Sequence, residues 1–374
     1  MMKTVLLALC LVLPLAAQEK ARNVILFLGD AGGIPTLNAA SILGHGEPRQ
    51  LYIQSMPHVA LSDTTSASSW VSDSAAGMTA IVAGEKTHNG VVSQSAEAVR
   101  GEKDGEPLKT ILEYAEERGL STGVVTNMNA ADATPAACYA HVNSRSDFSQ
   151  IFQQLLEPKF GDGVDVLIGT GLDRIGEALA EDGLDLKKMV EESAWTLYDS
   201  VDAIPTDKGH AIALFESRED FDLAEAVDRS ITILSRNPKG FFLMVEGDMH
   251  TSDVRAGLRR ALQLDDIIRE TAERMEDDTL LMFTADHSFD LRIGGGGRGK
   301  PLLDESDEAS YSEDRKSYQG PAVRMYNSHT GEEVVVAAEG PGAEGVRGFM
   351  ANSDLFDVMM AAYGWKPDQP RPTQ

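Results

Sequence analysis

Apolar runs of strand length alternate with helical patterns along most of this chain. Several of the runs are continuously apolar, which is typical of strands that are covered on both faces. The candidate strands span residues 23–28, 121–126, 164–168, 211–215, 241–246, 279–284 and 333–337. This alternation predicts an α/β fold with a doubly wound, mostly parallel central sheet and helices on both of its faces.

Three of the intervening helices have recognisable ends or faces. Pro107 and Gly119 bracket one helix, and Ser353 and Gly364 bracket another, because Pro suits a first turn and Gly suits a helix end. A third helix keeps an apolar face at Val254, Leu258, Leu262, Ile268, Ala272 and Met275.

The first residues have the pattern of a secretory signal peptide. A basic start, a short apolar run and small residues at its end predict cleavage of residues 1–17 and a mature protein in a periplasm or outside the cell. Only Cys138 then remains, so no internal disulfide is expected. Residues 18–374 are expected to form a single catalytic domain, with a polar surface excursion at about 303–320.

The charge balance narrows the classes of partner. The chain has 59 Asp plus Glu against 33 Lys plus Arg, and its pI is near 4.6. Such a balance argues against nucleic-acid binding and against docking on anionic lipid. No later apolar run is long enough to cross a bilayer. An anionic substrate would need bound cations, because the overall field repels it.

Residues that bind metal ions stand where predicted strands end. Glu246 follows one apolar run, Asp286 and His287 follow another, and Asp30 ends the first strand beside glycines. Open α/β sheets bind their ligands at the carboxyl ends of the strands. These side chains therefore predict a metalloenzyme.

Further polar groups are candidates for the same site. Ser74 precedes small, helix-compatible residues, so its hydroxyl is expected at a helix N-terminus, where an alkoxide or a phosphoryl group is favoured. By itself, this motif is more typical of a simple helix cap, and the other candidate residues change that interpretation. Thr134 offers a hydroxyl to a hard cation, and Arg145 suits a bidentate grip on phosphate or sulfate. Asp132 and His329 could each be an ordinary surface residue instead of part of a site.

Taken in chain order, these segments resemble the alkaline phosphatase family over about residues 23–363. The matching pieces are Gly29-Asp30, Asp73-Ser74-Ala75-Ala76, Ala133-Thr134-Pro135-Ala136-Ala137, His141-Val142-Asn143-Ser144-Arg145, Met244-Val245-Glu246-Gly247, Thr284-Ala285-Asp286-His287 and His329-Thr330-Gly331-Glu332. The resemblance implies an alkaline-phosphatase-like fold and a metal-dependent phosphomonoesterase.

The resemblance also implies a role for each matching residue. Ser74 matches the nucleophile that forms a phosphoseryl intermediate, and Arg145 matches the phosphate clamp. Asp30, Asp286 and His287 match the ligands of one zinc ion.

A magnesium ion and a second zinc ion are implied in the same way. Asp30 would bridge to the magnesium ion, which Thr134 and Glu246 would also hold, with Asp132 nearby. His329 matches one ligand of the other zinc.

The chain departs from the family at the second zinc site. Where the family has an Asp and a His ligand, this chain has Thr251 and Arg255. In one hypothesis His250 and Asp253 join His329 as ligands. In a second, which we prefer from the sequence, Arg255 replaces the zinc with a fixed cation. In a third, the protein binds phosphate compounds but turns over poorly.

The function predicted from the sequence is that of an exported phosphatase. It would hydrolyse small-molecule phosphate monoesters through Ser74 with Zn²⁺ and Mg²⁺ as cofactors. The alternatives are a degenerate member with little turnover and a related phosphodiesterase. The oligomeric state is left open, with a homodimer as one candidate.

Overall fold

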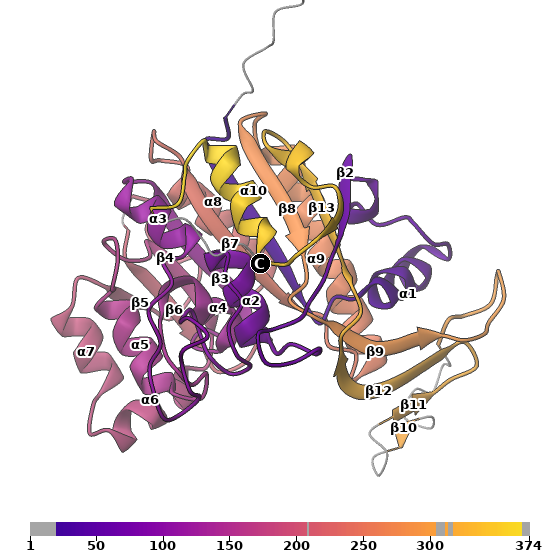
Figure 1. The fold of residues 1–374 in the computed structure, drawn as a ribbon, viewed down its shortest axis with the longest axis horizontal. Coiled ribbons are helices and arrows are strands. Elements are labelled where there is room, and N and C mark those ends of the chain that lie inside the picture. The colour runs from indigo at the N-terminus through magenta and orange to yellow at the C-terminus, as the bar shows by residue number, and fades with distance from the viewer. Residues whose placement is uncertain (1–19, 208, 304–310, 313–316, 369–374) are drawn as a thin grey trace, which may run out of the picture.

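Ten strands form the central sheet of the molecule (Figure 1). The computed structural model describes residues 20–207, 209–303, 311–312 and 317–368, so the predicted signal peptide at 1–17 lies outside the described residues. The strands of this sheet are β1 (Asn23–Asp30), β2 (His58–Ser62), β3 (Ser121–Asn129), β4 (Val166–Thr170), β5 (Thr196–Tyr198), β6 (Ala211–Phe215), β7 (Phe241–Asp248), β8 (Thr279–Thr284), β13 (Val334–Glu339) and β14 (Gly348–Met350).

The order of the strands confirms the predicted fold class. They lie side by side as β14-β2-β13-β8-β1-β7-β3-β4-β6-β5. β13 runs antiparallel to both of its neighbours, and the remaining pairs are parallel. The sheet is therefore mostly parallel, as the apolar runs predict.

Helices cover both faces of this sheet. They are α1 (Ile34–His45), α2 (Ser74–Ala83), α3 (Ile111–Glu117), α4 (Ala133–Tyr139), α5 (Phe148–Leu156), α6 (Leu172–Glu181), α7 (Leu186–Glu192), α8 (Leu223–Leu234), α9 (Val254–Arg274) and α10 (Asp354–Tyr363). On β1, Val24 and Leu26 pack in one core with α2, α3, α4 and α10. Ile25 and Phe27 pack in a second core with α1, α8 and α9. Burial of each such side chain contributes about 1.5–3 kcal/mol to the stability of the fold. Successive side chains of the strand point to opposite faces of the sheet, and both faces are covered by helices, so both are apolar.

A second, four-stranded sheet projects beside α1 (Figure 1). It consists of β10 (Tyr311–Ser312), β11 (Ser317–Gln319), β12 (Val323–Thr330) and β9 (Ser288–Ile293), which lie in that order and pair antiparallel. The predicted excursion at 303–320 falls partly on 304–310 and 313–316, outside the described residues, and its described part contributes β10 and β11. The sequence pattern does not predict this sheet. It places His329 ahead of the last strand, whereas the structure places it within β12.

The helix predicted from Pro107 begins one turn later, at Ile111. Thr110 and Glu113 form a capping box, in which the Thr110 hydroxyl accepts the Glu113 N–H and the Glu113 carboxylate accepts the Thr110 N–H. Pro107 lies instead in an isolated β-bridge. Gly364, with a φ of 73°, ends α10 as predicted.

No helix among the described residues is both long enough and apolar enough to span a bilayer.

Candidate active site

The carboxyl edge of the central sheet brings the predicted ligand residues together. β1 pairs in parallel with both β7 and β8. Asp30 ends β1 opposite Asp248, two residues beyond Glu246 on β7, while Asp286 and His287 directly follow β8. Three adjacent strands thus end at one edge, so side chains far apart in sequence converge there.

Asp30, Asp286 and His287 form a fully buried group. Their ligand atoms all lie within 4.8 Å of one another. His287 Nε2 is 3.5 Å from Asp30 Oδ1 and 3.3 Å from Asp286 Oδ2. Both of these carboxylate oxygens are buried without a hydrogen-bond partner among the described residues. Since buried polar atoms are normally paired, and two carboxylates with one imidazole are zinc ligands, a cation fits this group.

The ionisation of this group also favours a cation. Burial, together with repulsion from Asp286 and Glu246, raises the pKa of Asp30 well above its usual value. Burial lowers the pKa of His287 to about 4, so its imidazole is neutral near pH 7 and offers a lone pair. A positive ion among these residues would stabilise the ionised carboxylates.

Ser74 is the first residue of α2 and lies against this group. Its Oγ is 3.3 Å from His287 Nε2, an atom that Asp30 and Asp286 also approach. Asp73 caps the helix by accepting a backbone N–H of the first turn, which leaves the Ser74 hydroxyl available to the site. Gly77 permits the close approach of α2, because a Cβ there would lie 2.6 Å from the backbone oxygen of Asp286.

His250, His287 and His329 form a second group. One ligand atom from each lies within 4.8 Å of the others. The Nε2 atoms of His250 and His329 are 3.3 Å apart, and the rings of His287 and His329 are stacked with centroids 3.7 Å apart. His250 Nδ1 is 3.8 Å from Asp30 Oδ1, so the two groups adjoin. Imidazole nitrogens are common zinc ligands, and this group suits a second transition-metal ion.

Three residues after His250 that bear on the second metal site differ in burial and contacts. Thr251 is fully buried, and its hydroxyl has no hydrogen-bond partner among the described residues. Asp253 is exposed and its carboxylate accepts the N–H of Ala256 as the cap of α9, so the structure does not bring it to His250 and His329. Arg255 is half-buried in the first turn of α9.

Glu246 lies beside two threonine hydroxyls at the same edge of the sheet. Its carboxylate accepts a hydrogen bond from Thr126, and the Thr134 side chain opposes the rise in its pKa. Burial raises the pKa of Glu246 to about 8, and repulsion from Asp132 and Asp286 adds to the shift. Carboxylate and hydroxyl oxygens are ligands for a hard cation such as magnesium.

Arg145 is held between two carboxylates. Its Nη1 is 3.2 Å from Asp73 Oδ2, and its Nη2 is 2.9 Å from Asp132 Oδ1. The two ion pairs raise the pKa of the guanidinium despite its burial. They also fix its plane beside the N-terminus of α2, where a phosphate would be bound.

Sequence reasoning misses two residues of the site, Thr126 and Asp248. Thr126 lies opposite Glu246 in the register of β3 and β7, which only the assembled sheet reveals. Asp248 is buried at the end of β7. The sequence could have identified Asp248 by its position two residues beyond Glu246, at the end of the same strand.

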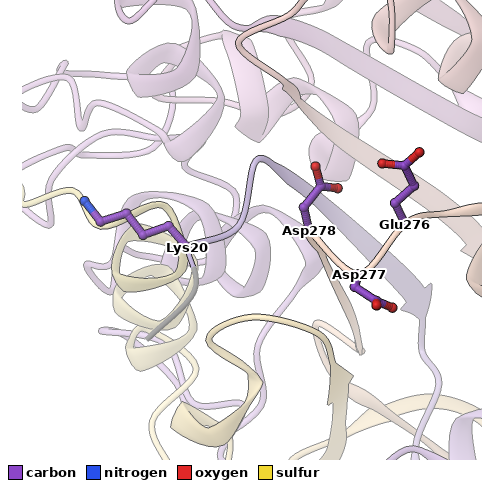
Figure 2. A pocket seen from close by; sticks show the side chains of 4 residues that line it. All are labelled: Lys20, Glu276, Asp277 and Asp278. Carbon is purple, nitrogen blue, oxygen red and sulfur yellow. The ribbon is translucent and has the colours of Figure 1, made fainter. Parts of the chain in front are cut away.

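A surface hollow of about 680 Å³ lies at the opposite edge of the sheet, lined by Lys20, Glu276, Asp277 and Asp278 (Figure 2). Lys20 precedes β1 and Asp278 precedes β8, so the hollow lies at the amino ends of these strands. In Figure 2 the Lys20 side chain extends away from the three carboxylates. The candidate ligands lie at the carboxyl ends, so the hollow is remote from them.

Known proteins resemble this chain over most of its length. The family model described as alkaline phosphatase matches residues 21–189 and 213–319. An alkaline phosphatase of Gadus morhua is 30% identical in a match that covers 88% of this chain and 89% of the relative. The tissue-nonspecific alkaline phosphatase isozyme of Rattus norvegicus is 28% identical in a match that covers 91% of this chain and 83% of the relative.

The fold is likewise shared with a solved structure. The alkaline phosphatase from the Antarctic bacterium TAB5 superposes with a TM-score of 0.75 over 94% of this chain and 100% of that chain, at 21% identity. At this level of identity, the similarity supports the fold alone.

Proposed function

Because this chain belongs to the alkaline phosphatase family and is a phosphoric monoester hydrolase, we propose that it works through a phosphoseryl intermediate on Ser74. The observation that carries the proposal is the position of the Ser74 hydroxyl. It lies in the first turn of α2, 3.3 Å from His287 Nε2 and against the buried group of Asp30, Asp286 and His287. The positive end of the helix favours both the alkoxide and the phosphorylated side chain.

Arg145 is the proposed phosphate clamp. Its guanidinium can donate two parallel hydrogen bonds to phosphate oxygens, and the carboxylates of Asp73 and Asp132 keep it oriented toward the start of α2. The carboxylates of the sheet edge, such as Asp30 and Glu246, repel a phosphate dianion. Arg145 offsets part of that repulsion with a charge that belongs to the chain itself.

Zinc and magnesium are the proposed cofactors. Asp30, Asp286 and His287 would hold a zinc ion, and Asp30 with Glu246 and Thr134 would hold a magnesium ion, near Asp132. When bound, such cations stabilise the negative charge that develops on the oxygens of a phosphoryl transfer and activate water. The unpartnered oxygens of Asp30 and Asp286 support the first assignment.

For the altered second zinc site, we propose that His250 and His329 are the ligands. His287, which is assigned to the first zinc ion, lies beside them. Their facing Nε2 atoms support this hypothesis over replacement of the ion by Arg255. Asp253 has no part in the proposed site, because its carboxylate caps α9.

We also propose that the protein is exported after cleavage of residues 1–17. Fractionation of cells that express the full chain, with a variant lacking residues 2–17 as control, would test export. The resemblance to alkaline phosphatases further suggests a homodimer, which sedimentation would test.

Hydrolysis of p-nitrophenyl phosphate with added zinc and magnesium tests the proposed function. The matched control is bis(p-nitrophenyl) phosphate, which a phosphodiesterase would prefer. Phosphoserine at residue 74, trapped by acid quench and located by peptide mass spectrometry, is the expected intermediate. Turnover that proceeds without phosphate ever appearing on Ser74 would contradict the proposal.

A further inference from the structure

We propose that Asp248 is the positioning residue of the His250–His329 metal site. This inference rests on the proposed function, because it assigns the support of one of the proposed metal sites. It concerns a carboxylate that binds no ion itself and acts through His250.

The contact between Asp248 and His250 fixes which imidazole nitrogen can bind a metal. Asp248 Oδ1 accepts the backbone N–H of His250 at 2.9 Å and lies 2.8 Å from His250 Nδ1. A carboxylate can only accept, so Nδ1 carries the proton and Nε2 keeps its lone pair. That Nε2 is the atom that faces His329 Nε2 at 3.3 Å. Carboxylate–histidine pairs of this kind orient metal-binding imidazoles.

Asp248 is itself held by two arginines. Its second oxygen, Oδ2, is 2.6 Å from Arg218 Nη1 and 3.2 Å from Arg260 Nη2. These two ion pairs favour the ionised carboxylate beside His250. Both of its oxygens are engaged, and the side chain has little freedom to rotate away from His250.

The backbone around Asp248 is fixed as well. Arg260 donates to the carbonyl oxygens of Asp248 and His250, at 2.8 and 2.9 Å. Between them, Met249 N donates to the carbonyl of Asp30, a residue of the neighbouring ligand group. The turn that carries His250 is therefore tied to the site on one side and to α9 on the other.

A merely structural role for Asp248 is the competing hypothesis, since it neutralises Arg218 and Arg260. The two roles differ in what a variant changes. A structural residue would alter the stability of the whole fold, whereas a positioning residue would alter the affinity of one metal site and the tautomer of one imidazole.

Zinc binding to the metal-stripped protein separates the two roles. Asp248→Ala should weaken one of the two zinc sites by roughly 10–100-fold, the range found when a partner of a metal-binding His is removed. Asp248→Asn should weaken it less, because an amide oxygen can still accept the Nδ1–H. The zinc held by Asp30, Asp286 and His287 should keep its affinity in both variants.

Long-range ¹H–¹⁵N NMR of the metal-free protein gives the second readout. The parent should show His250 protonated at Nδ1, and Asp248→Ala should show a mixture of tautomers. Arg218→Gln is the matched control, because it breaks an ion pair of Asp248 without touching His250. It should lower stability while leaving the tautomer and both zinc affinities near those of the parent.

An Asp248→Ala variant that is folded by circular dichroism and binds two zinc ions as tightly as the parent would overturn the inference. If that variant does not fold, Asp248→Asn decides by the same criterion. A His250→Ala variant that keeps both zinc ions would also overturn it. None of these measurements uses turnover, so they stand apart from a failure of the Ser74 mechanism.

Discussion

The Nε2 atoms of His250 and His329 lie 3.3 Å apart, although 79 positions separate the two residues in the chain. His250 follows β7 of the central sheet, whereas His329 belongs to β12 of the small sheet. β9, the partner of β12, begins directly after His287, so the small sheet starts at the metal-binding edge and returns His329 to it. The pair of imidazoles thus offers ligands for the second zinc ion, which Thr251 and Arg255 cannot bind.

Variants of His250 and Arg255 should therefore behave differently. His250→Ala should lower the zinc content by about one ion per chain, because it leaves His329 as the single proposed ligand of the second zinc ion. Arg255→Ala should leave the zinc content unchanged. Elemental mass spectrometry of the dialysed proteins measures both. A parent with one zinc ion per chain, and a burst of released alcohol before a slow steady rate, would favour Arg255 as the replacement cation instead.

Ser74→Ala should remove most of the turnover of p-nitrophenyl phosphate, by about 10³-fold or more, because it deletes the nucleophile. The zinc content and the thermal unfolding temperature should stay near those of the parent. Ser72→Ala is a matched control in the same segment and should retain most of the activity. Comparable rates for Ser74→Ala and the parent would exclude a phosphoseryl mechanism.

Asp286→Ala should lose the zinc ion of the buried group, since it removes one of its three ligands. Asp253→Ala, which removes a carboxylate from the exposed cap of α9, should keep the full metal content. Titration with zinc against a competing chelator would measure the two affinities. Equal zinc binding by Asp286→Ala and the parent would contradict this assignment.

Magnesium affinity should rise with pH through the region near 8. Burial raises the pKa of Glu246 to about 8 in the metal-free protein, so below that pH the ion must displace a proton. The binding constant should increase by up to about tenfold per pH unit for each displaced proton, and the raised pKa of Asp30 adds to the dependence on pH. Calorimetry in buffers of different ionisation enthalpy would detect the released proton, and its absence at pH 7 would contradict the prediction.

Glu116→Gln should stabilise the protein at neutral and alkaline pH. Burial raises the pKa of Glu116 to about 9, from an ordinary value of 4.5. Below pH 4.5 the Glu116 carboxyl is protonated in both the folded and the unfolded state, so its titration does not change the free energy of unfolding. As pH rises toward 9, the unfolded state ionises first, and the folded state loses up to about 1.4 kcal/mol per pH unit.

The glutamine avoids this loss and keeps the local hydrogen bonds. Its oxygen can accept the Gly163 N–H, and its amide can donate to Thr122, the two present partners of Glu116. Urea unfolding at pH 4.5 and pH 8 measures the difference. Exposed Glu117→Gln is the control and should show little dependence on pH. An equal effect of Glu116→Gln at both pH values would refute the buried, neutral carboxyl.

The sequence by itself determined the strands of the central sheet and the presence of metal-binding side chains at their carboxyl ends. Strands such as 211–215 and 279–284 were predictable because burial on both faces requires a continuous apolar run. Asp30, Glu246 and Asp286 were predictable as candidates, because a carboxylate at the carboxyl end of a buried parallel strand lies at the edge where such sheets bind their ligands.

Only the tertiary structure decided how the altered metal site is built. β12 has eight residues, but most of them are polar or exposed, so it carries no continuous apolar signal that would place His329. The pairing of Thr126 with Glu246 depends on strand register, and the contacts of His250 with His329 and of Asp248 with Arg260 depend on the paths of β12 and α9. Local sequence fixes the residues that can bind a metal, but their distances follow from contacts between segments that are distant in the chain.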